Sequence, residues 1–386
     1  MATTEELRLG YLAIALEFMN LAELKWCLAL QAEASPPPTL GHVLKKEGYV
    51  SQRDLEYLEM VMRAKLERGD PDPLLTAEEL SIDRIERAVV ARLGRALRGG
   101  TFGRFRVLGQ VGRGGMGLVL KVEDGQDPTP LALKILVGSG GATVKDIERF
   151  KKEAAIMAAF QAQTRHPNIV QIYDVGREKG LDYIVMEFID GLSLAELLDE
   201  RLPTLQESLE IARGVADALR SIHNRAIYHR DLKPANVMLE STGRPVLMDF
   251  GLAVFEKFEA TGRRKRGSVG TPQYQPPEQA DVGGEFGPIG PASDVYGLGA
   301  TLYHLLTGAA PFEGTDRNEI RQQVLTVEPR PPREVNADVP VEVEKLVLRC
   351  LQKRAEDRYP NTVELIKDLD RLLGKGPKPP ARRLRF

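Results

Sequence analysis

The stretch HRDLKPANV (His229–Val237), followed at a short interval by Asp249-Phe250-Gly251, decides what kind of fold this chain adopts. Taken singly, the acids, the amide and the lysine in these strings would be assigned to solvated loop surfaces, where such residues usually lie. Here they share one short string and are followed by a further acid and a glycine, a combination typical of a catalytic loop. The rest of the chain can be interpreted outward from this loop.

Phosphoryl transfer is the chemistry that these side chains fit. Its transition state is loose, so an enzyme mainly positions groups and neutralises charge. Asp231 fits the carboxylate that accepts the proton of a substrate hydroxyl, and Lys233 fits the cation that stabilises the transferring phosphoryl group. Asn236 and Asp249 offer the hard oxygen ligands that Mg²⁺ prefers. The predicted catalytic residues are Asp231, Lys233 and Asn236, and the predicted metal ligands are Asn236 and Asp249.

A glycine-rich string, GRGGMGLV (Gly112–Val119), lies upstream of these loops. Glycines let backbone amides approach a triphosphate closely and tolerate a tight turn. The pattern alone fits a dinucleotide-binding turn equally well, but such a turn opens a helix. Here the chain continues as LVLKV, which is typical of a strand, so a β-hairpin over a nucleotide is favoured. The predicted nucleotide contacts are Val111, Gly112, Arg113, Gly114, Gly115, Met116, Gly117, Leu118 and Val119.

Lys134 lies in the next strand-like run, LALKIL. An isolated lysine flanked by aliphatic residues is most often a solvated charge at a sheet edge. After a glycine hairpin it is placed to reach the α- and β-phosphates, provided that a carboxylate orients it. Glu153, in the helical run FKKEAAIMAAF, is the predicted partner because Ile156 and Met157 mark the buried face of that helix. Glu148 is the alternative, ranked lower because it lies near the expected helix start.

From residue 105 to residue 373 the sequence resembles the eukaryotic-type (Hanks-type) Ser/Thr protein kinases, and most of all their bacterial branch. Further landmarks follow in family order: HPNIV from His166, IVMEF from Ile184, GTPQY from Gly270 and PPE from Pro276. The resemblance implies an α+β, bilobal kinase fold with a β-rich N-lobe and a helical C-lobe. It also implies ATP and Mg²⁺ as cofactors, protein Ser/Thr hydroxyls as acceptors, and a role in intracellular signalling.

The same resemblance assigns further residues. Asp294 resembles the buried aspartate that braces the catalytic-loop backbone, and Arg358 resembles the arginine that pairs with Glu278. These are structural roles, so changes there are expected to cost stability along with activity. The gatekeeper position falls on Met186, and the adenine-binding backbone groups fall on Glu187 and Phe188.

The rival function is an inactive pseudokinase scaffold that binds ATP without transfer. That reading predicts the loss of the lysine, the catalytic aspartate or the metal ligands. All of these groups are present in the sequence, so the active enzyme is favoured.

Regulation by phosphorylation is predicted from Arg230, which immediately precedes the catalytic aspartate. Family members with this arginine are commonly switched by a phosphorylated activation segment, because a phosphate adds about two negative charges that arginines bind. The candidate acceptors are Ser268, Thr261 and Thr271. Ser268 is favoured, because Thr271 fits a structural hydroxyl bonded to Asp231 and Lys233.

Three segments organise the chain. Residues 1–98 are predicted to form a small all-α domain that binds a partner, dimerises, senses a nucleotide or packs on the small lobe. Residues 40–55 are similar to the helical N-terminal modules of bacterial secretion-type ATPases. Residues 15–24 resemble residues 44–55, which indicates either an internal repeat or chance amphipathic similarity. Residues 105–373 form the catalytic domain, and residues 374–386 form a basic, proline-containing tail.

Composition and charge limit the class of partner and the cellular location that can be expected. With 42% hydrophobic and 28% charged residues the chain has material for a large core, and a net charge of −2 gives no drive towards nucleic acid. Charged residues interrupt the apolar stretch 11–30, and the start of the chain is acidic, so neither a membrane span nor a secretory signal is expected there. A cytoplasmic location is predicted. The basic tail is either solvated or the juxtamembrane part of a longer, membrane-anchored protein.

Overall fold

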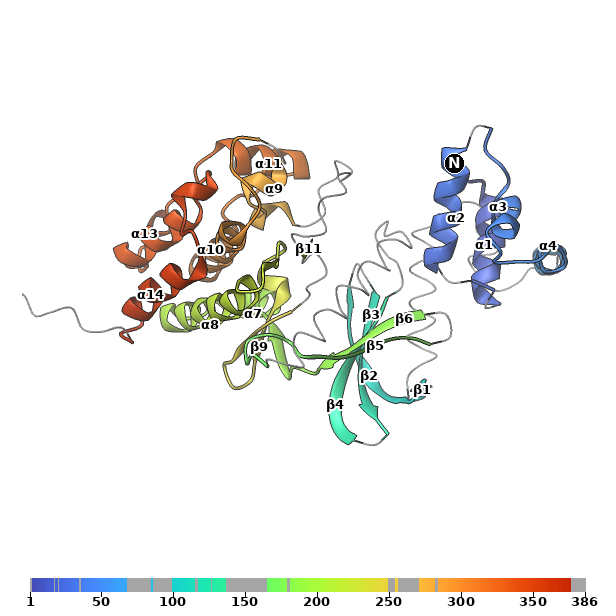
Figure 1. Ribbon diagram of the computed structural model, residues 1–386, viewed down its shortest axis with the longest axis horizontal. Coiled ribbons are helices and arrows are strands. Elements are labelled where there is room, and N and C mark those ends of the chain that lie inside the picture. The colour runs from blue at the N-terminus through green and yellow to red at the C-terminus, as the bar shows by residue number, and fades with distance from the viewer. Residues whose placement is uncertain are drawn as a thin grey trace, which may run out of the picture. The chain divides into compact units, whose positions relative to one another are not determined.

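The computed structural model describes residues 2–16, 18–19, 21–34, 36–67, 85, 99–114, 117–125, 127–136, 165–178, 181–248, 254–255, 271–281 and 284–375. Its contacts divide the chain into two compact units. The first unit contains Met1–Ala159 and Gln171–Phe188, and the second contains Phe160–Val170 and Ile189–Phe386. Figure 1 shows the helices and strands of both along the chain.

The first unit contains a six-stranded antiparallel sheet in the order β1-β2-β3-β4-β6-β5. Aliphatic and β-branched residues dominate these runs and favour strands. The strands are β1 (Thr101–Phe102), β2 (Phe105–Gly114), β3 (Gly117–Asp124), β4 (Asp127–Leu136), β5 (Ile172–Glu178) and β6 (Leu181–Glu187). The strands expected from LVLKV and LALKIL are confirmed as β3 and β4.

One face of this sheet is an apolar core. Side chains alternate between the two faces of a strand, so Leu133 and Ile135 share a face and Lys134 lies on the other. Leu133 and Ile135 are fully buried, and the rings of Phe102 and Phe105 pack edge-on against Tyr183. The buried cluster, here called the small-lobe core, consists of Phe102, Phe105, Val107, Leu118, Leu120, Val122, Leu133, Ile135 and Val185, joined by Leu7, Tyr11 and Ile85.

Four helices precede the sheet in the described part of residues 1–98 (Figure 1). They are α1 (Thr4–Ala15), α2 (Leu21–Glu33), α3 (Leu40–Lys46) and α4 (Gln52–Glu67). Thr3 caps α1 in a reciprocal capping box with Glu6. Ser51 and Asp54 exchange the equivalent bonds at the start of α4, at 2.8 and 3.1 Å.

These helices form an internal repeat with a period of 31 residues (40 − 9 = 31). Its clearest sign is a pair of close helix contacts. A Cβ on Gly10 would lie 2.5 Å from the Leu24 side chain, and one on Gly41 would lie 3.1 Å from Leu55. The buried positions follow the same period: Leu9, Leu12, Ala13, Met19, Leu24 and Cys27 correspond to Leu40, Val43, Leu44, Val50, Leu55 and Leu58. The repeat indicated by the sequence is present, with this register.

The second unit is mainly helical. Its helices of ten or more residues are α8 (Leu205–His223), α10 (Pro291–Thr307), α11 (Arg317–Thr326), α13 (Val341–Cys350) and α14 (Thr362–Leu372). The shorter ones are α7 (Leu194–Glu200), α9 (Pro277–Ala280) and α12 (Pro332–Val335), with 3₁₀ turns η1 (Pro234–Asn236), η3 (Pro272–Tyr274) and η4 (Ala355–Asp357). These helices agree with the helical C-lobe that the family resemblance implies.

Short strands complete the second unit. One three-stranded sheet has the order β10-β9-β7, and β11 pairs with β8. These strands are β7 (Gly191–Ser193), β8 (Ile227–Tyr228), β9 (Val237–Glu240), β10 (Pro245–Leu247) and β11 (Val254–Phe255). Strand β8 precedes and β9 follows the segment that ends in η1. These two strands therefore fix where the catalytic string, His229–Val237, begins and ends. Among the described residues, no helix is long and apolar enough to cross a bilayer.

Candidate active site

The catalytic string, His229–Val237, follows β8 and has an unusual backbone conformation near its start. Arg230 has φ of 64°, in the left-handed region that L-residues other than glycine avoid. Such a conformation costs roughly 1–2 kcal/mol and persists only where surrounding bonds hold it. The string therefore depends on contacts from elsewhere in the second unit.

Asp231 is held by two neighbours in the string. Lys233 donates from Nζ to Asp231 Oδ2 at 2.8 Å. Asn236 donates from Nδ2 to the same Oδ2 at 3.0 Å and to the Asp231 carbonyl at 2.8 Å. All three side chains come from the loop that ends in η1. The structure thus brings together Asp231, Lys233 and Asn236, the three predicted catalytic residues.

His229 connects this loop to the chain that follows β10. Its ring is fully buried, and Nε2 lies 2.9 Å from the carbonyl oxygen of Met248. Its Nδ1 accepts the Asp231 N–H at 3.4 Å. Met248 also donates its N–H to the Asn236 carbonyl at 2.8 Å. These bonds fix the residue immediately before Asp249, which itself lies outside the described residues.

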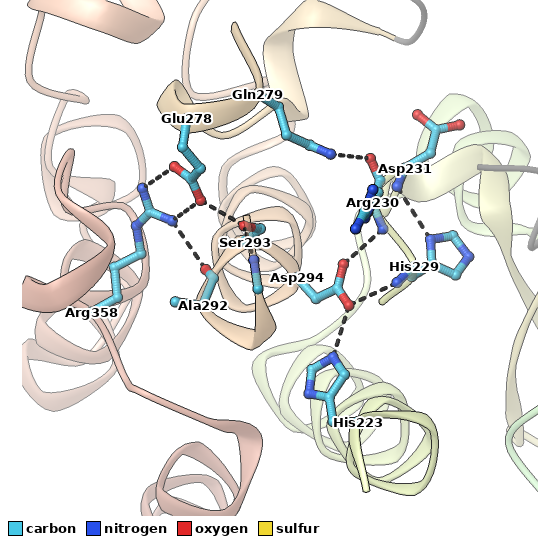
Figure 2. Close-up of polar contacts among 11 residues, drawn as sticks. His223, His229, Arg230, Asp231, Glu278, Gln279, Ala292, Ser293, Asp294 and Arg358 are labelled. Carbon is cyan, nitrogen blue, oxygen red and sulfur yellow. Dashed lines mark hydrogen bonds and ion pairs between the residues drawn. The ribbon is translucent and has the colours of Figure 1, made fainter. Parts of the chain in front are cut away.

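Asp294, in the first turn of α10, braces the string through its backbone N–H groups, as Figure 2 shows. Its carboxylate accepts the backbone N–H groups of His229 and Arg230 at 2.8 Å each, and Nε2 of His223 at 2.8 Å. Burial by itself would raise the pKa of Asp294. The hydrogen bond and positive charge of His223, together with the Arg230 N–H, outweigh burial and hold that pKa below its ordinary value.

A second buried polar cluster ties the end of the activation segment to the helical core (Figure 2). Arg358 donates to both oxygens of Glu278, at 2.7 and 2.8 Å, and both side chains are 1% exposed or less. Ser293 donates to Glu278 at 2.7 Å, and Gln279 donates to the Arg230 carbonyl at 3.2 Å. The predicted roles of Asp294 and of the Glu278–Arg358 pair are confirmed.

Three residues of this network were not predicted. His223 ends an amphipathic helix, and Ser293 and Gln279 stand beside residues that were singled out. Their types are common on surfaces. Ser293 and Gln279 are marked in the sequence only by standing next to Asp294 and Glu278, and His223 has no such neighbour. Each contributes one hydrogen bond to a buried charged or backbone group.

Another contact lies just after Thr271. The Tyr274 hydroxyl is 2.7 Å from Nδ1 of His304, and the two rings stack. Burial, helped by Glu313, raises the pKa of Tyr274 to about 12, and burial lowers the pKa of His304. The pair therefore stays uncharged near neutral pH. The expected bonds from Thr271 to Asp231 and Lys233 are not formed among the described residues.

In the first unit the glycine string forms the expected hairpin. Gly112 pairs with Val119 and Gly114 with Gly117 across β2 and β3, and no helix follows, so the dinucleotide-turn reading is wrong. Lys134, on β4, lies between Val119 and Ile184 on the neighbouring strands. It is 8% exposed, which is unusual for a lysine and differs from the sheet-edge alternative.

The rest of the predicted nucleotide site is only partly described. Met186 and Glu187 end β6, and Phe188 follows directly. The N–H of Glu187 donates to the Gln171 carbonyl at 2.8 Å. Several predicted residues lie outside the described residues: Gly115, Met116, Glu148, Glu153, Asp249, Thr261 and Ser268, together with the side chain of Arg113.

Comparison with known proteins supplies the context for this geometry. Residues 105–368 match the family model described as the protein kinase domain. Serine/threonine-protein kinase PknB of Mycobacterium leprae is 34% identical over 277 residues, which is 70% of this chain and 43% of that protein. Serine/threonine-protein kinase PrkC of Bacillus subtilis is 33% identical over 268 residues, which is 69% of this chain and 40% of that protein.

A solved structure agrees with these sequence matches. The kinase domain of Mycobacterium tuberculosis PknI aligns with a TM-score of 0.56 and 27% identity, over 72% of this chain and 98% of that chain. The expected fold class is thereby confirmed. The chain spans about two fifths of the length of the curated relatives that it matches.

Proposed function

Because this chain belongs to the protein kinase family, in its bacterial Ser/Thr branch, we propose that it transfers the γ-phosphoryl group of ATP to serine or threonine hydroxyls of proteins. The observation that carries the proposal is the Asp231 carboxylate, oriented by Lys233 and Asn236 on a loop braced by Asp294. Because the loop is already held in this way, substrate binding energy is not needed to order the Asp231 carboxylate.

The roles of the loop residues follow from their geometry. Asp231 accepts the proton of the attacking hydroxyl, and its free oxygen is the atom that faces the acceptor. Lys233 already lies 2.8 Å from Oδ2, so its ammonium offsets negative charge that develops beside the carboxylate. Asp294 bonds the loop backbone and His223, and His229 bonds the Asp231 N–H and the Met248 carbonyl, so both act as positioning residues.

Magnesium fits the donor set that the chain offers. The Asn236 amide uses its nitrogen towards Asp231, so its oxygen is the atom that can ligate a hard cation. Asp249 would be the second protein ligand. When bound, the metal would neutralise phosphate charge during transfer. His229 and Asn236 both bond Met248 and so position the chain that leads to Asp249.

ATP is proposed to bind at the glycine hairpin and Lys134. Backbone amides at the hairpin tip suit phosphate oxygens, and a buried ammonium on β4 suits the α- and β-phosphates. Glu153 is proposed to orient Lys134, and Glu187 and Phe188 to bind adenine through their backbones. A pseudokinase scaffold is disfavoured because its catalytic loop would not need the Asp231, Lys233 and Asn236 contacts.

Activation-segment phosphorylation is proposed as the switch. Arg230 is 7% exposed and its backbone is fixed by Asp294 and Gln279, so a phosphate that binds its guanidinium would act on the catalytic string directly. Ser268 is the proposed acceptor, with Thr261 and Thr271 as alternatives. Full activity of Ser268→Ala/Thr261→Ala, with no phosphate found in the segment by mass spectrometry, would contradict this.

Asp231→Asn tests the proposed activity. We expect phosphate transfer from ATP to a generic protein acceptor to fall by about 10²–10⁴-fold, because a general base is removed, while ATP affinity is retained. Asp338→Asn, at an exposed aspartate, is the matched control and keeps full activity. Equal rates for Asp231→Asn and the unaltered chain would rule out the assignment.

A further inference from the structure

The two helical repeats bury the same inner positions but differ on one outer face. In the first repeat, Leu7 and Tyr11 lie four residues apart on α1 and are 8% and 5% exposed. Their counterparts 31 residues later are Pro38, which is half-buried, and His42, which is exposed. The outer face formed by Leu7 and Tyr11 is therefore apolar and buried in the first repeat. The equivalent face of the second repeat is polar and exposed at His42.

What covers the first stripe is the small lobe of the kinase. Leu7 and Tyr11 belong to the small-lobe core, together with Ile85 and the sheet residues Phe102 and Phe105. Ala2, Ile14 and Leu28 pack against the same cluster. The other stripe of α1, formed by Leu9, Leu12 and Ala13, belongs to the core that the two repeats share. A single helix thus joins both cores.

An ion pair fixes the same docking at a second point. Glu23, on α2, accepts from Arg177, on β5, at 2.9 Å, and Glu23 is only 17% exposed. Tyr49 lies beside this pair: burial, followed by the charge of Glu23, raises its pKa to about 12, and Arg177 opposes the shift. In the second repeat the counterpart of Glu23 is Asp54, which caps α4 instead. At this position too, only the first repeat contacts the sheet.

The docked face is the back of the nucleotide-binding sheet. Leu133 and Ile135 point into the small-lobe core, and Lys134 between them points to the opposite face. Strands β2, β3 and β4, which carry the glycine hairpin and Lys134, therefore share their packing with α1. Without α1, part of the small-lobe core would be exposed to water. The strands would then lose apolar packing and open more readily.

We propose that the first helical repeat is an intramolecular activating partner of the kinase small lobe, docked through Leu7, Tyr11 and the Glu23–Arg177 pair, and that its docking sets the affinity for ATP. The second repeat completes the core of the module and leaves its own outer stripe uncovered. This inference rests on the proposed function for its ATP readout, but its structural readout is independent of catalysis.

The internal repeat supplies a matched test. Tyr11→Asp places a carboxylate in the shared cluster, and His42→Asp places one at the equivalent exposed position. For Tyr11→Asp in the full chain we expect faster amide hydrogen exchange in β2, β3 and β4 and a KM for ATP raised about tenfold, within the usual range of coupling between sites. His42→Asp leaves both unchanged. Equal behaviour of the two variants would overturn the proposal.

Amide hydrogen exchange in α2, α3 and α4 reports whether the module is still folded. If it shows that Tyr11→Asp has unfolded the module, charge reversal decides instead. Glu23→Arg alone should speed exchange in β5 and raise the KM for ATP, and Glu23→Arg/Arg177→Glu should restore both. Exchange that is unaffected by the single reversal, or not restored by the double, would overturn the proposal. A chain that transfers no phosphate at all would refute the proposed function, and the exchange result would still decide the docking.

Discussion

The loop that carries Asp231 and the six-stranded sheet that carries Lys134 are held by opposite kinds of interaction. The loop is fixed by directional bonds from buried polar groups, of which Asp294 and the Glu278–Arg358 pair are the centres. The sheet is fixed by a large apolar cluster with no required direction, and Lys134 is the buried polar group on its other face. Removing one partner of a buried polar contact leaves the other partner buried without a hydrogen bond. Trimming an apolar side chain instead lowers the free energy of unfolding in proportion to the atoms removed.

The strongest test of this contrast is Arg358→Ala. Arg358 uses its guanidinium nitrogens on Glu278 and on the carbonyls of Gln352, Lys353 and Ala292. Its removal leaves a buried carboxylate without its main partner, and we expect the free energy of unfolding to fall by about 3–5 kcal/mol. Chemical denaturation measures this.

The control for that prediction is Arg354→Ala, because Arg354 pairs with Glu356 at the surface. An exposed pair of this kind is screened by water and contributes little to stability. A similar loss for both arginines would show that burial of the Glu278–Arg358 pair is not what gives it importance.

Asp294→Asn is expected to have the next largest effect. An amide cannot accept all three bonds that the carboxylate accepts, so the fold should lose about 1–3 kcal/mol and kcat should fall about 10²-fold through misplacement of Asp231. The KM for ATP should stay close to that of the unaltered chain. Asp338→Asn serves again as the control, and an equal drop in ATP affinity would contradict the separation between loop and sheet.

The same aspartate predicts a pH dependence. Because the folded-state pKa of Asp294 is lowered, its contribution to stability is complete above the pKa of the unfolded chain and is lost as the pH falls through the folded-state value. Acid titration of unfolding should therefore show a smaller loss of stability for Asp294→Asn than for the unaltered chain. Parallel titration curves would contradict this.

The smallest expected effect is that of Ile135→Val. It removes one methylene group from the small-lobe core beside Lys134, which should cost about 1 kcal/mol and leave kcat unchanged. Thermal unfolding and steady-state kinetics measure the two quantities. A large fall in kcat would show that the sheet positions Lys134 as strictly as the polar network positions Asp231.

The same contrast explains how far the sequence could be interpreted. Asp231, Lys233 and Asn236 were predictable because phosphoryl transfer requires these groups in one string, and Asp294 and Arg358 because the family resemblance marks their places. His223, Ser293 and Gln279 were not, because each matters only through a neighbour brought close by folding. The 31-residue period was faint in the sequence, since one copy places Ala13 where the other has Leu44. It becomes plain only when the buried positions are known.

The doubled helical module also constrains how the chain can evolve. A duplication begins with two equal copies, yet only the first now bears a face committed to the sheet, so changes at Tyr11 must be matched by changes around Phe102 and Phe105. The face that holds His42 is under no such constraint. Substitutions on that exposed face should cost the small-lobe core less than substitutions at Tyr11, so the second copy is freer than the first to acquire a new binding specificity.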